Sequence, residues 1–357
     1  GAIIFGKVSM HEYAWGITND NPHYGPVKNP WKLEHIPGGS SGGSGAAVAA
    51  HATLASLGTD TAGSIRIPSS ACGIVGLKPT FGRVSKYGVY PLAWTLDHVG
   101  PMTKTVSDAA GLLNVIAGYD SNDPTSVNTK KEDYLTYTKD SVENLVIGIE
   151  EEYYFSNVDS RVEDVVRKNI KLLEEQGAKV KRVKLPTLAY GEWTELVTSL
   201  AEAATIHDVH LREQPENLGD DIKALFYVGQ LISSIDYLQA QQVRRQIKHD
   251  FNKVFEEVDV LIAPTLPVLP PLIGEKKLIL NGNEEDVTDQ VIRYMGPANL
   301  VGLPALSVPG GIVEGLPVGV QIIGPAFEEK RLFVVGEVIE KTRPLKEAVP
   351  ELFQKNE

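Results

Sequence analysis

Two short segments of the chain contain the residue types that nucleophilic catalysis requires. Residues 38–45 read GGSSGGSG and lead into a run of small residues, and residues 58–68 read GTDTAGSIRIP. A serine hydroxyl is a weak nucleophile unless a base lies beside it. Successive backbone N–H groups at a tight turn can converge on the oxygen that becomes negative during attack on a carbonyl. The small residues before Ser64 make it a candidate nucleophile. The expected N–H donors are Thr61, Ala62, Gly63 and Ser64.

Taken one at a time, neither segment decides between a structural and a catalytic role. Residues 38–45 fit a flexible Gly/Ser linker, a phosphate loop at a helix N-terminus, or a catalytic loop whose glycines allow close backbone approach. The lysine of the phosphate-loop pattern is missing. A serine in a tight turn such as that of Ser64 is more often structural than catalytic.

Together with CGIVGLKPT at residues 72–80, the two segments resemble the signature of the amidase-signature family. Shorter matching pieces occur at residues 6–14, 29–31, 85–88, 96–101, 302–309 and 315–324. The resemblance therefore covers nearly the whole chain. The family uses a Ser-cisSer-Lys triad, so the resemblance implies that Ser64 is the nucleophile and Ser40 the cis-serine. It also implies a cis peptide bond before Ser40.

The resemblance also assigns supporting roles around the two serines. Because a hydroxyl both donates and accepts, Ser40 can pass a proton between Ser64 and the lysine. The residues expected to support the site are Ser41, Asp60, Thr61 and Arg66. Asp60 and Arg66 are expected to hold the shape of the turn by hydrogen bonds or ion pairing. Thr61 is expected to hydrogen bond to the serines.

The catalytic lysine has no counterpart in these 357 residues. By the family's interval it falls before residue 1, and Lys7 and Lys78 belong to other matching pieces, where they are interpreted as structural or solvated. Residues 1–5 read GAIIF, which is typical of a short buried strand. We therefore expect an N-terminally truncated member of the family whose amide hydrolysis is impaired.

The substrate is predicted from one further comparison of positions. The glutaminase subunit of the tRNA-dependent amidotransferase has a basic pair that grips the carboxylate of glutamine, and Ala224 and Leu225 occupy those places here. Since neither residue can bind a carboxylate as a guanidinium does, we expect a stand-alone general amidase. It would act on small neutral or apolar amides through an acyl-enzyme and release ammonia or an amine. The alternatives are the glutaminase subunit of the aspartyl/glutamyl-tRNA amidotransferase, and a non-catalytic relative or scaffold.

Composition narrows the expected partners. The net charge is −12 and no lysine- or arginine-rich run occurs. Because basic side chains supply most of the affinity for nucleic acid, we expect a small-molecule amide and no nucleic-acid partner, and a homodimer stays open. The single cysteine, Cys72, fits a reducing, cytoplasmic setting. No apolar run reaches the roughly 20 residues that cross a bilayer. The resemblance implies neither a metal nor an organic cofactor.

Helical and strand-like segments alternate along most of the chain, which predicts an α/β fold: a mixed, twisted sheet with helices on both faces. We interpret residues 1–357 as a single domain that lacks its N-terminal part. Helices are expected at residues 46–57, 105–117, 160–177, 235–258 and 328–342. Strands are expected at residues 145–149, 180–185, 259–263, 305–308 and 318–323. Loops are expected at residues 119–142, 186–230 and 264–295.

Two histidine patterns are interpreted as non-catalytic. His207 and His210 lie three apart on a predicted helix, but no third metal ligand is recognisable, so both are expected at the surface. Asp97 and His98 are adjacent on a predicted strand and would point to opposite faces. They are therefore not expected to form a charge-relay pair.

Overall fold

The computed structural model describes residues 2–130, 132–342 and 350, and at its centre lies one mixed sheet in the strand order β3-β5-β4-β11-β12-β8-β6-β7. The strands are β3 (Ala55–Asp60), β4 (Val75–Lys78), β5 (His98–Thr103), β6 (Val146–Glu150), β7 (Lys179–Val183), β8 (Val260–Pro264), β11 (Ala305–Val313) and β12 (Leu316–Ile323). β6 pairs in parallel with β7 and β8, and the other neighbouring pairs are antiparallel. The mixed sheet predicted from the sequence is confirmed.

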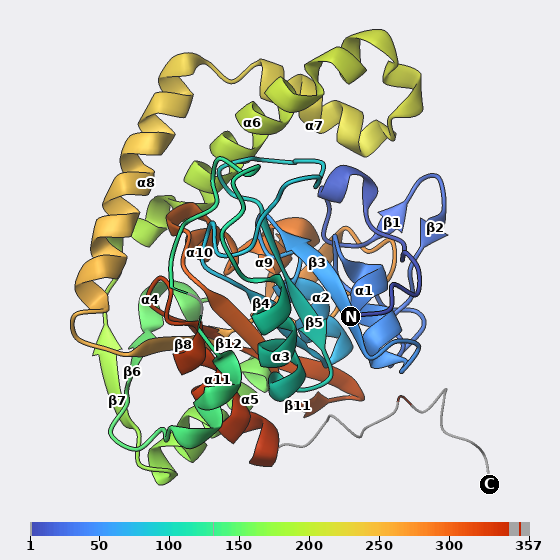
Figure 1. Cartoon of the computed structure of the whole chain (residues 1–357). Coiled ribbons are helices and arrows are strands. Elements are labelled where there is room, and N and C mark those ends of the chain that lie inside the picture. The colour runs from blue at the N-terminus through green and yellow to red at the C-terminus, as the bar shows by residue number, and fades with distance from the viewer. Residues whose placement is uncertain (1, 131, 343–349, 351–357) are drawn as a thin grey trace, which may run out of the picture.

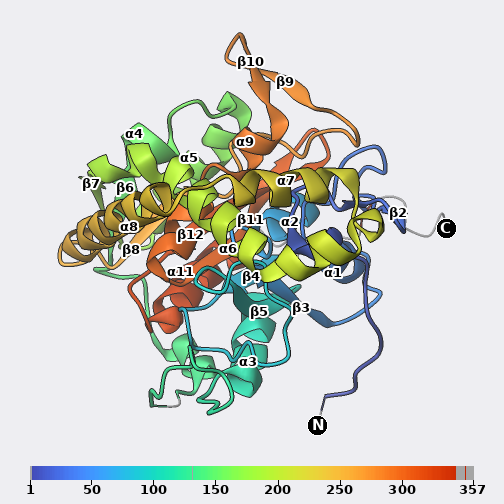
Figure 2. The same ribbon diagram turned by 90° about the horizontal axis from the view of Figure 1, so that it is seen from above.

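Helices cover both faces of this sheet (Figures 1 and 2). On one face lie α3 (Val106–Ile116), α5 (Ser160–Glu175) and α11 (Glu329–Thr342), with Gly336 of α11 against Leu306 and Val308. On the opposite face lies α2 (Arg66–Cys72), whose Ser69 and Ser70 lie against Gly76 and Gly319. The apolar side chains of the central strands are buried against both helix layers, as expected for a sheet covered on both sides.

Three further helices line the top and the left side of the molecule in Figure 1. They are α6 (Gly191–Glu213), α7 (Asp220–Gln230) and α8 (Ser234–Val254). α7 lies so close to α6 that a Cβ on Gly229 would stand 2.3 Å from the carbonyl oxygen of Leu200. α8 begins with a capping box between Ser233 and Asp236, which satisfies N–H groups of its first turn. None of the helices in the described part of the chain is long and apolar enough to cross a membrane.

The remaining elements are short. The helices are α1 (Gly42–Ala49), α4 (Glu151–Tyr154), α9 (Val287–Ile292) and α10 (Gly296–Val301). Two hairpins are formed by β1 (Asp20–Asn21) with β2 (Gly25–Pro26) and by β9 (Lys277–Leu280) with β10 (Asn283–Asp286). Short 3-10 helices occur at Glu12–Ala14, Tyr134–Lys139, Pro186–Tyr190 and Pro215–Asn217.

Most predicted elements are present within a few residues of their expected bounds, but four expectations are wrong. The helix predicted at residues 46–57 ends at Ala49, because His51 adopts a positive φ of 57° and β3 begins at Ala55. Residues 2–5 form no strand and are exposed. Most of the loop predicted at residues 186–230 is helical, and the loop at 264–295 contains the β9–β10 hairpin and α9.

Candidate active site

The glycine-rich segment at residues 38–45 is part of the core. All eight of its residues are buried, and the last four begin α1. A Cβ on Gly39 would stand 2.4 Å from the carbonyl oxygen of Gly16, so a larger residue does not fit there. The peptide bond between Gly39 and Ser40 is cis, as the resemblance implies. This close packing rules out the flexible linker.

The structure brings Ser40 and Ser64 to adjoining segments. The backbone N–H of Ser41 donates to the carbonyl of Ser64 across 3.3 Å. The Ser41 hydroxyl accepts from the N–H of Thr59 at 3.3 Å, which ties the glycine-rich loop to β3. Ser40 is fully buried, and its Oγ has no hydrogen-bond partner within the described ranges. A buried hydroxyl without a hydrogen-bond partner is unusual, and the Ser40 hydroxyl is therefore a candidate for transferring a proton.

A buried ion pair between Asp60 and Arg66 holds the turn that carries Ser64. Arg66 Nε and one terminal nitrogen each donate to the Asp60 carboxylate at 3.0 Å. The same carboxylate accepts the backbone N–H of Gly63 at 2.8 Å and of Ile65 at 3.2 Å. The expected ion pair therefore forms, and Asp60 also organises the backbone on both sides of Ser64.

Two residues from the C-terminal half complete the surroundings of Arg66. Gln321 of β12 accepts from one terminal nitrogen at 2.6 Å, and Asn299 of α10 accepts from the other at 2.6 Å. Asn299 in turn donates to Asp60 Oδ1 at 2.9 Å. Burial on its own raises the pKa of Asp60, but the charge and hydrogen bonds of Arg66 outweigh it. The pKa of Asp60 therefore lies below its ordinary range, and the group is a carboxylate at neutral pH.

Three of the four expected N–H donors remain available at the turn. The N–H of Gly63 is used by Asp60, so it does not face a substrate. No backbone hydrogen bond in the described part of the chain uses the N–H groups of Thr61, Ala62 or Ser64. Ala62 needs no positive φ, whereas Gly63 has a φ of 109°. The alanine at position 62 is thus compatible with the turn.

The Thr61 hydroxyl does not bond to the serines as expected. It donates to Asp97 Oδ1 at 2.6 Å. Asp97 makes no hydrogen bond to His98, whose Nδ1 lies beside the carbonyls of Leu96 and Asp60. The prediction that Asp97 and His98 form no relay pair is confirmed.

Neither lysine of the matching pieces contacts the two serines. Lys78 is fully buried, and its ammonium donates to the carbonyls of Pro79 and Leu303. Burial lowers its pKa well below the ordinary value. Lys7 is exposed. Both fit the structural and solvated roles expected of them.

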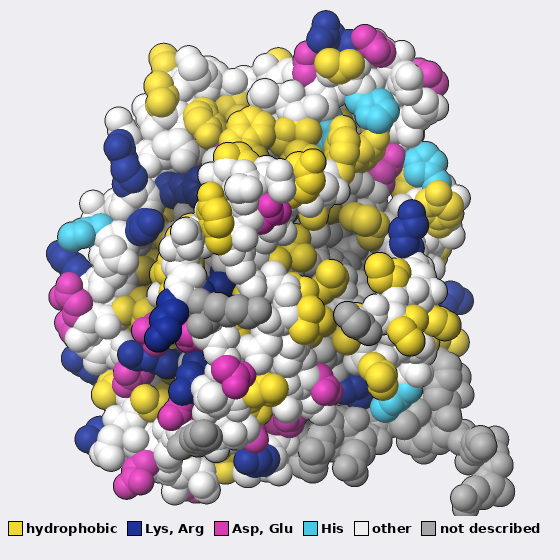
Figure 3. All heavy atoms as spheres, viewed as in Figure 1, with side chains coloured by type: hydrophobic (Ala, Val, Ile, Leu, Met, Phe, Trp, Pro, Cys, Tyr) yellow, Lys and Arg dark blue, Asp and Glu magenta, His cyan; other side chains and the backbone are white. Residues whose placement is uncertain are grey.

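A pocket of about 220 Å³ lies beside the turn. Its polar and charged lining residues are Thr59, Thr61, Lys86, Asp97, His98, Asp123 and Thr125. Its other lining residues are Ala14, Val89, Tyr90, Pro91, Leu92, Trp94, Val99 and Pro124. Hydrophobic side chains gather beneath α7 on the face shown in Figure 3. Ala224 and Leu225 do not line this pocket.

The expectation of two surface histidines is wrong for His207. Its side chain is fully buried on α6 and stacks on Phe226 of α7 with ring centroids 4.3 Å apart. Burial lowers its pKa to about 4, so it is neutral at pH 7. His210 lies within hydrogen-bond distance of the Tyr13 hydroxyl, at 3.1 Å. The histidines therefore help to pack α6 against α7 and the N-terminal segment.

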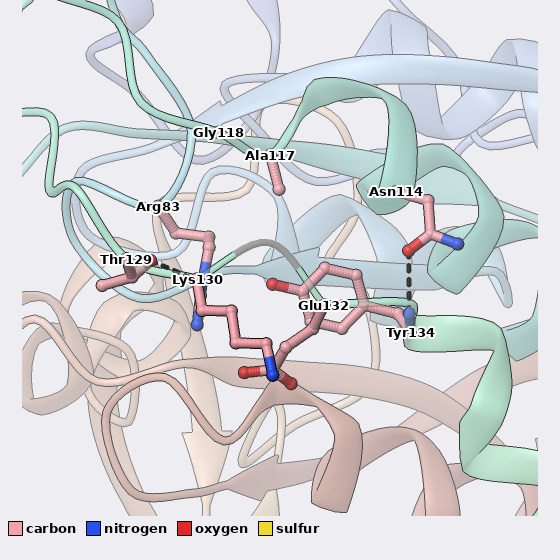
Figure 4. A pocket seen from close by; sticks show the side chains of 8 residues that line it. All are labelled: Arg83, Asn114, Ala117, Gly118, Thr129, Lys130, Glu132 and Tyr134. Atoms are coloured by element: carbon pink, nitrogen blue, oxygen red, sulfur yellow. Dashed lines mark hydrogen bonds between the residues drawn. The ribbon is translucent and has the colours of Figure 1, made fainter.

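A second cavity of about 10 Å³ has room for roughly one water molecule (Figure 4). Arg83 and Tyr134 line it, and the Arg83 Nε and Tyr134 hydroxyl have no partners within the described residues. None of its lining residues belongs to residues 38–45 or 58–68. We therefore do not place the catalytic reaction in this cavity.

Sequence reasoning missed Asn299, Gln321 and the role of Asp97. Gln321 and Asp97 fall within matching pieces, which is a signal that each has a specific neighbour. The sequence does not say which neighbour, because Gln321 and Arg66 are 255 positions apart.

Comparisons with known proteins show the family to which the chain belongs. The family model described as Amidase matches residues 1–333. The chain is 41% identical to the A subunit of glutamyl-tRNA(Gln) amidotransferase from Halothermothrix orenii, over 99% of this chain and 78% of the relative. It is also similar to the crystal structure of the protein of that name from Thermotoga maritima, with a TM-score of 0.85 and 39% identity, over 98% of this chain and 76% of the other. A third similar structure is a chain of a vestigial protein complex that reveals the evolutionary origins of an s-triazine catabolic enzyme. It gives a TM-score of 0.89 and 33% identity, over 94% of this chain and 73% of the other.

These similarities correct two expectations. A closer likeness to general amidases is not supported, because the curated relatives at about 40% identity are named as the A subunit of an amidotransferase. The expected partner set, a small-molecule amide without nucleic acid, is wrong, because those relatives are named for glutamyl-tRNA(Gln). The net charge misled because it describes one chain, whereas the relatives are named as one subunit of an enzyme.

We expect Asp60→Asn to lower the free energy of unfolding by about 3–5 kcal/mol, because it leaves the buried Arg66 without its counter-charge. Urea denaturation at pH 7 measures this loss. The control is Lys184→Ala, which breaks an exposed pair with Glu152 and should leave stability unchanged. Equal stability of Asp60→Asn and the parent would contradict the role of the pair.

The same carboxylate predicts how stability depends on pH. Because the pKa of Asp60 is lower in the folded than in the unfolded chain, its contribution is complete above about pH 4 and is lost as the pH falls further. Urea denaturation repeated between pH 3 and pH 7 should therefore show a smaller acid-induced loss for Asp60→Asn than for the parent. Parallel losses would contradict this.

Gly63→Ala is expected to distort the turn that carries Ser64. The residue has a φ of 109°, and a Cβ would stand 2.4 Å from Met295 Cγ. Ala62→Gly, which only removes a methyl group at a position without positive φ, is the matched control. Amide hydrolysis should be lost in the first variant and kept in the second, and the reverse order would show that the turn is assigned wrongly.

Proposed function

This chain belongs to the amidase-signature family, and we propose that it cleaves amide bonds with Ser64 as the nucleophile. The observation that supports Ser64 most directly is its position. Its turn is held by Asp60 and Arg66, and its carbonyl accepts the N–H of Ser41, next to the orphan hydroxyl of Ser40. The two serines that the resemblance pairs are thus on adjoining segments of the core.

The proposed reaction proceeds in two halves. Ser64 Oγ attacks the amide carbonyl carbon and passes its proton to Ser40, while the N–H groups of Thr61, Ala62 and Ser64 donate to the oxyanion. The C–N bond then breaks, and the nitrogen leaves as ammonia or an amine after taking up a proton. The acyl group remains as an ester on Ser64 until water hydrolyses it to the acid.

Ser40 needs a base to receive its proton. The resemblance implies a lysine, but within the residues that the structure describes Ser40 Oγ is hydrogen-bonded to no group. We therefore propose that amide turnover by these 357 residues alone is slow. All activity tests, including that of Gly63→Ala, therefore use the protein as its natural host produces it, after its intact mass has been measured.

We further propose that the amide is the nitrogen donor of a tRNA-dependent amidotransferase reaction, in which the chain is the glutaminase component. The supporting observation is the 41% identity over 99% of the chain to a protein named as the A subunit of glutamyl-tRNA(Gln) amidotransferase. Ala224 and Leu225 offer no cation at the positions where the resemblance places a basic pair. Other residues of this chain must therefore hold the carboxylate of glutamine.

A serine-directed fluorophosphonate tests the nucleophile. The parent protein should gain one phosphonyl group on Ser64, detected by peptide mass spectrometry, and Ser64→Ala should gain none. Ser40→Ala should react about a hundredfold more slowly, because it removes the proton path. The control is Ser44→Ala, whose hydroxyl bonds to the carbonyl of Leu57 instead, and it should react as the parent does. Labelling of Ser64→Ala at the parent's rate would overturn the assignment.

Ammonia release tests the donor reaction. With glutamine, glutamyl-tRNA(Gln) and the remaining subunits of such an enzyme, the parent should release ammonia faster than with glutamine alone, and Ser64→Ala should not. Hydrolysis of acetamide but not of glutamine, with or without the other subunits, would contradict the amidotransferase proposal and leave the nucleophile intact.

A further inference from the structure

Asp97 lies at the junction between the Ser64 turn and the neighbouring pocket. It is buried and directly precedes β5. Its carboxylate accepts the Thr61 hydroxyl at 2.6 Å, and Thr61 is the first residue of the turn that carries the available N–H groups. An ionised acceptor makes this hydrogen bond stronger than one between neutral groups.

The same carboxylate closes the loop that forms one wall of the pocket. It accepts the N–H of Leu92 at 3.0 Å and that of Ala93 at 3.1 Å to both oxygens. In the other direction, the N–H of Asp97 donates to the carbonyl of Ala93 at 2.8 Å. The loop at residues 91–97 therefore folds around this one carboxylate.

The far side of that loop is fastened to the helical layer. Glu202 of α6 accepts both the N–H and the hydroxyl of Thr95, at 3.0 and 2.7 Å. Arg244 of α8 donates to the hydroxyl and carbonyl of Thr95 at 2.8 and 2.9 Å. With Thr95 fixed by two helices, the position of Asp97 is fixed as well, and so is the group to which Thr61 bonds.

We propose that Asp97 is a positioning residue for the reaction: through Thr61 it sets the direction of the oxyanion-binding N–H groups and links them to the pocket wall at residues 91–97. This inference rests on the proposed function of Ser64. Asp97 touches no reacting atom in this arrangement. Instead, Asp97 aligns the N–H groups of the turn with the carbonyl oxygen of the substrate as that oxygen becomes negative.

A loop-capping role alone would need only the bonds to Leu92 and Ala93. The bond to Thr61 is therefore the part that distinguishes positioning from capping. Thr61→Val removes that bond, keeps the shape of the side chain, and leaves the loop bonds of Asp97 in place. Thr61→Ser restores the hydroxyl.

The experiment measures the second-order rate constant for phosphonylation of Ser64, together with kcat and KM for amide hydrolysis. Thr61→Val should lower the labelling rate and kcat by about tenfold or more, with KM nearly unchanged, because it removes a hydrogen bond to a charged group. Thr61→Ser should recover most of the rate. Asp97→Asn should also lower kcat, whereas Asp164→Asn, at an exposed position of α5 outside the pocket lining, should not.

Each other outcome has a definite meaning. Thr61→Val that labels at the parent's rate, or a loss that follows the melting temperature and is not recovered by Thr61→Ser, overturns the positioning role. A parent that is not labelled at Ser64 overturns the proposed function, and this inference falls with it. A parent labelled at Ser64 with an unchanged Thr61→Val leaves the nucleophile standing and removes only the inference.

Discussion

The buried ion pair of Asp60 and Arg66 is the constraint on which the rest of the site depends. Removing two charges from water is costly, and the cost is offset only when the remaining hydrogen-bonding groups are satisfied. Here Asn299 and Gln321 complete the guanidinium, while backbone N–H groups around Ser64 complete the carboxylate. The turn therefore cannot change shape without leaving a buried charge unsatisfied.

This constraint explains why residues distant in the sequence meet at one turn. β12 contributes Gln321 and α10 contributes Asn299, and both elements belong to the part of the chain that follows α8. The glycine-rich loop then packs against the turn through Ser41, because glycine at position 39 lets its backbone pass close to that of Gly16. The sheet and the ion pair together hold the segments of Ser40 and Ser64 next to each other, joined by the bond from Ser41 N–H to the Ser64 carbonyl.

The sequence predicts the parts of this arrangement that have a local or family-wide signature. Alternating apolar segments predict the sheet and its helices, and the motif around Ser64 predicts Ser40, Asp60 and Arg66. The partners of these residues could not be predicted, because a hydrogen bond between Arg66 and Gln321 leaves no pattern in either segment. The prediction for His207 was wrong for the same reason. Its own helix shows two histidines with an aspartate between them, and it is buried by Phe226 of α7, Tyr13 and Tyr90, which are distant in the sequence.

The same reasoning separates the chemistry of the chain from its choice of substrate. Residues of the Ser64 turn are bonded to several distant elements, so substitution there disturbs a buried network. Position 224, by contrast, is exposed on α7, where a change of side chain breaks no such bond. The chain therefore combines about 40% identity to amidotransferase subunits with an alanine at an exposed position of α7 that lies outside this network. Identity over the whole chain supports the proposed donor reaction, but it does not say which residues hold the carboxylate of the donor. A substitution at an exposed position such as 224 leaves the hydrogen bonds of the Ser64 turn intact, so substrate contacts can change while the catalytic turn stays the same.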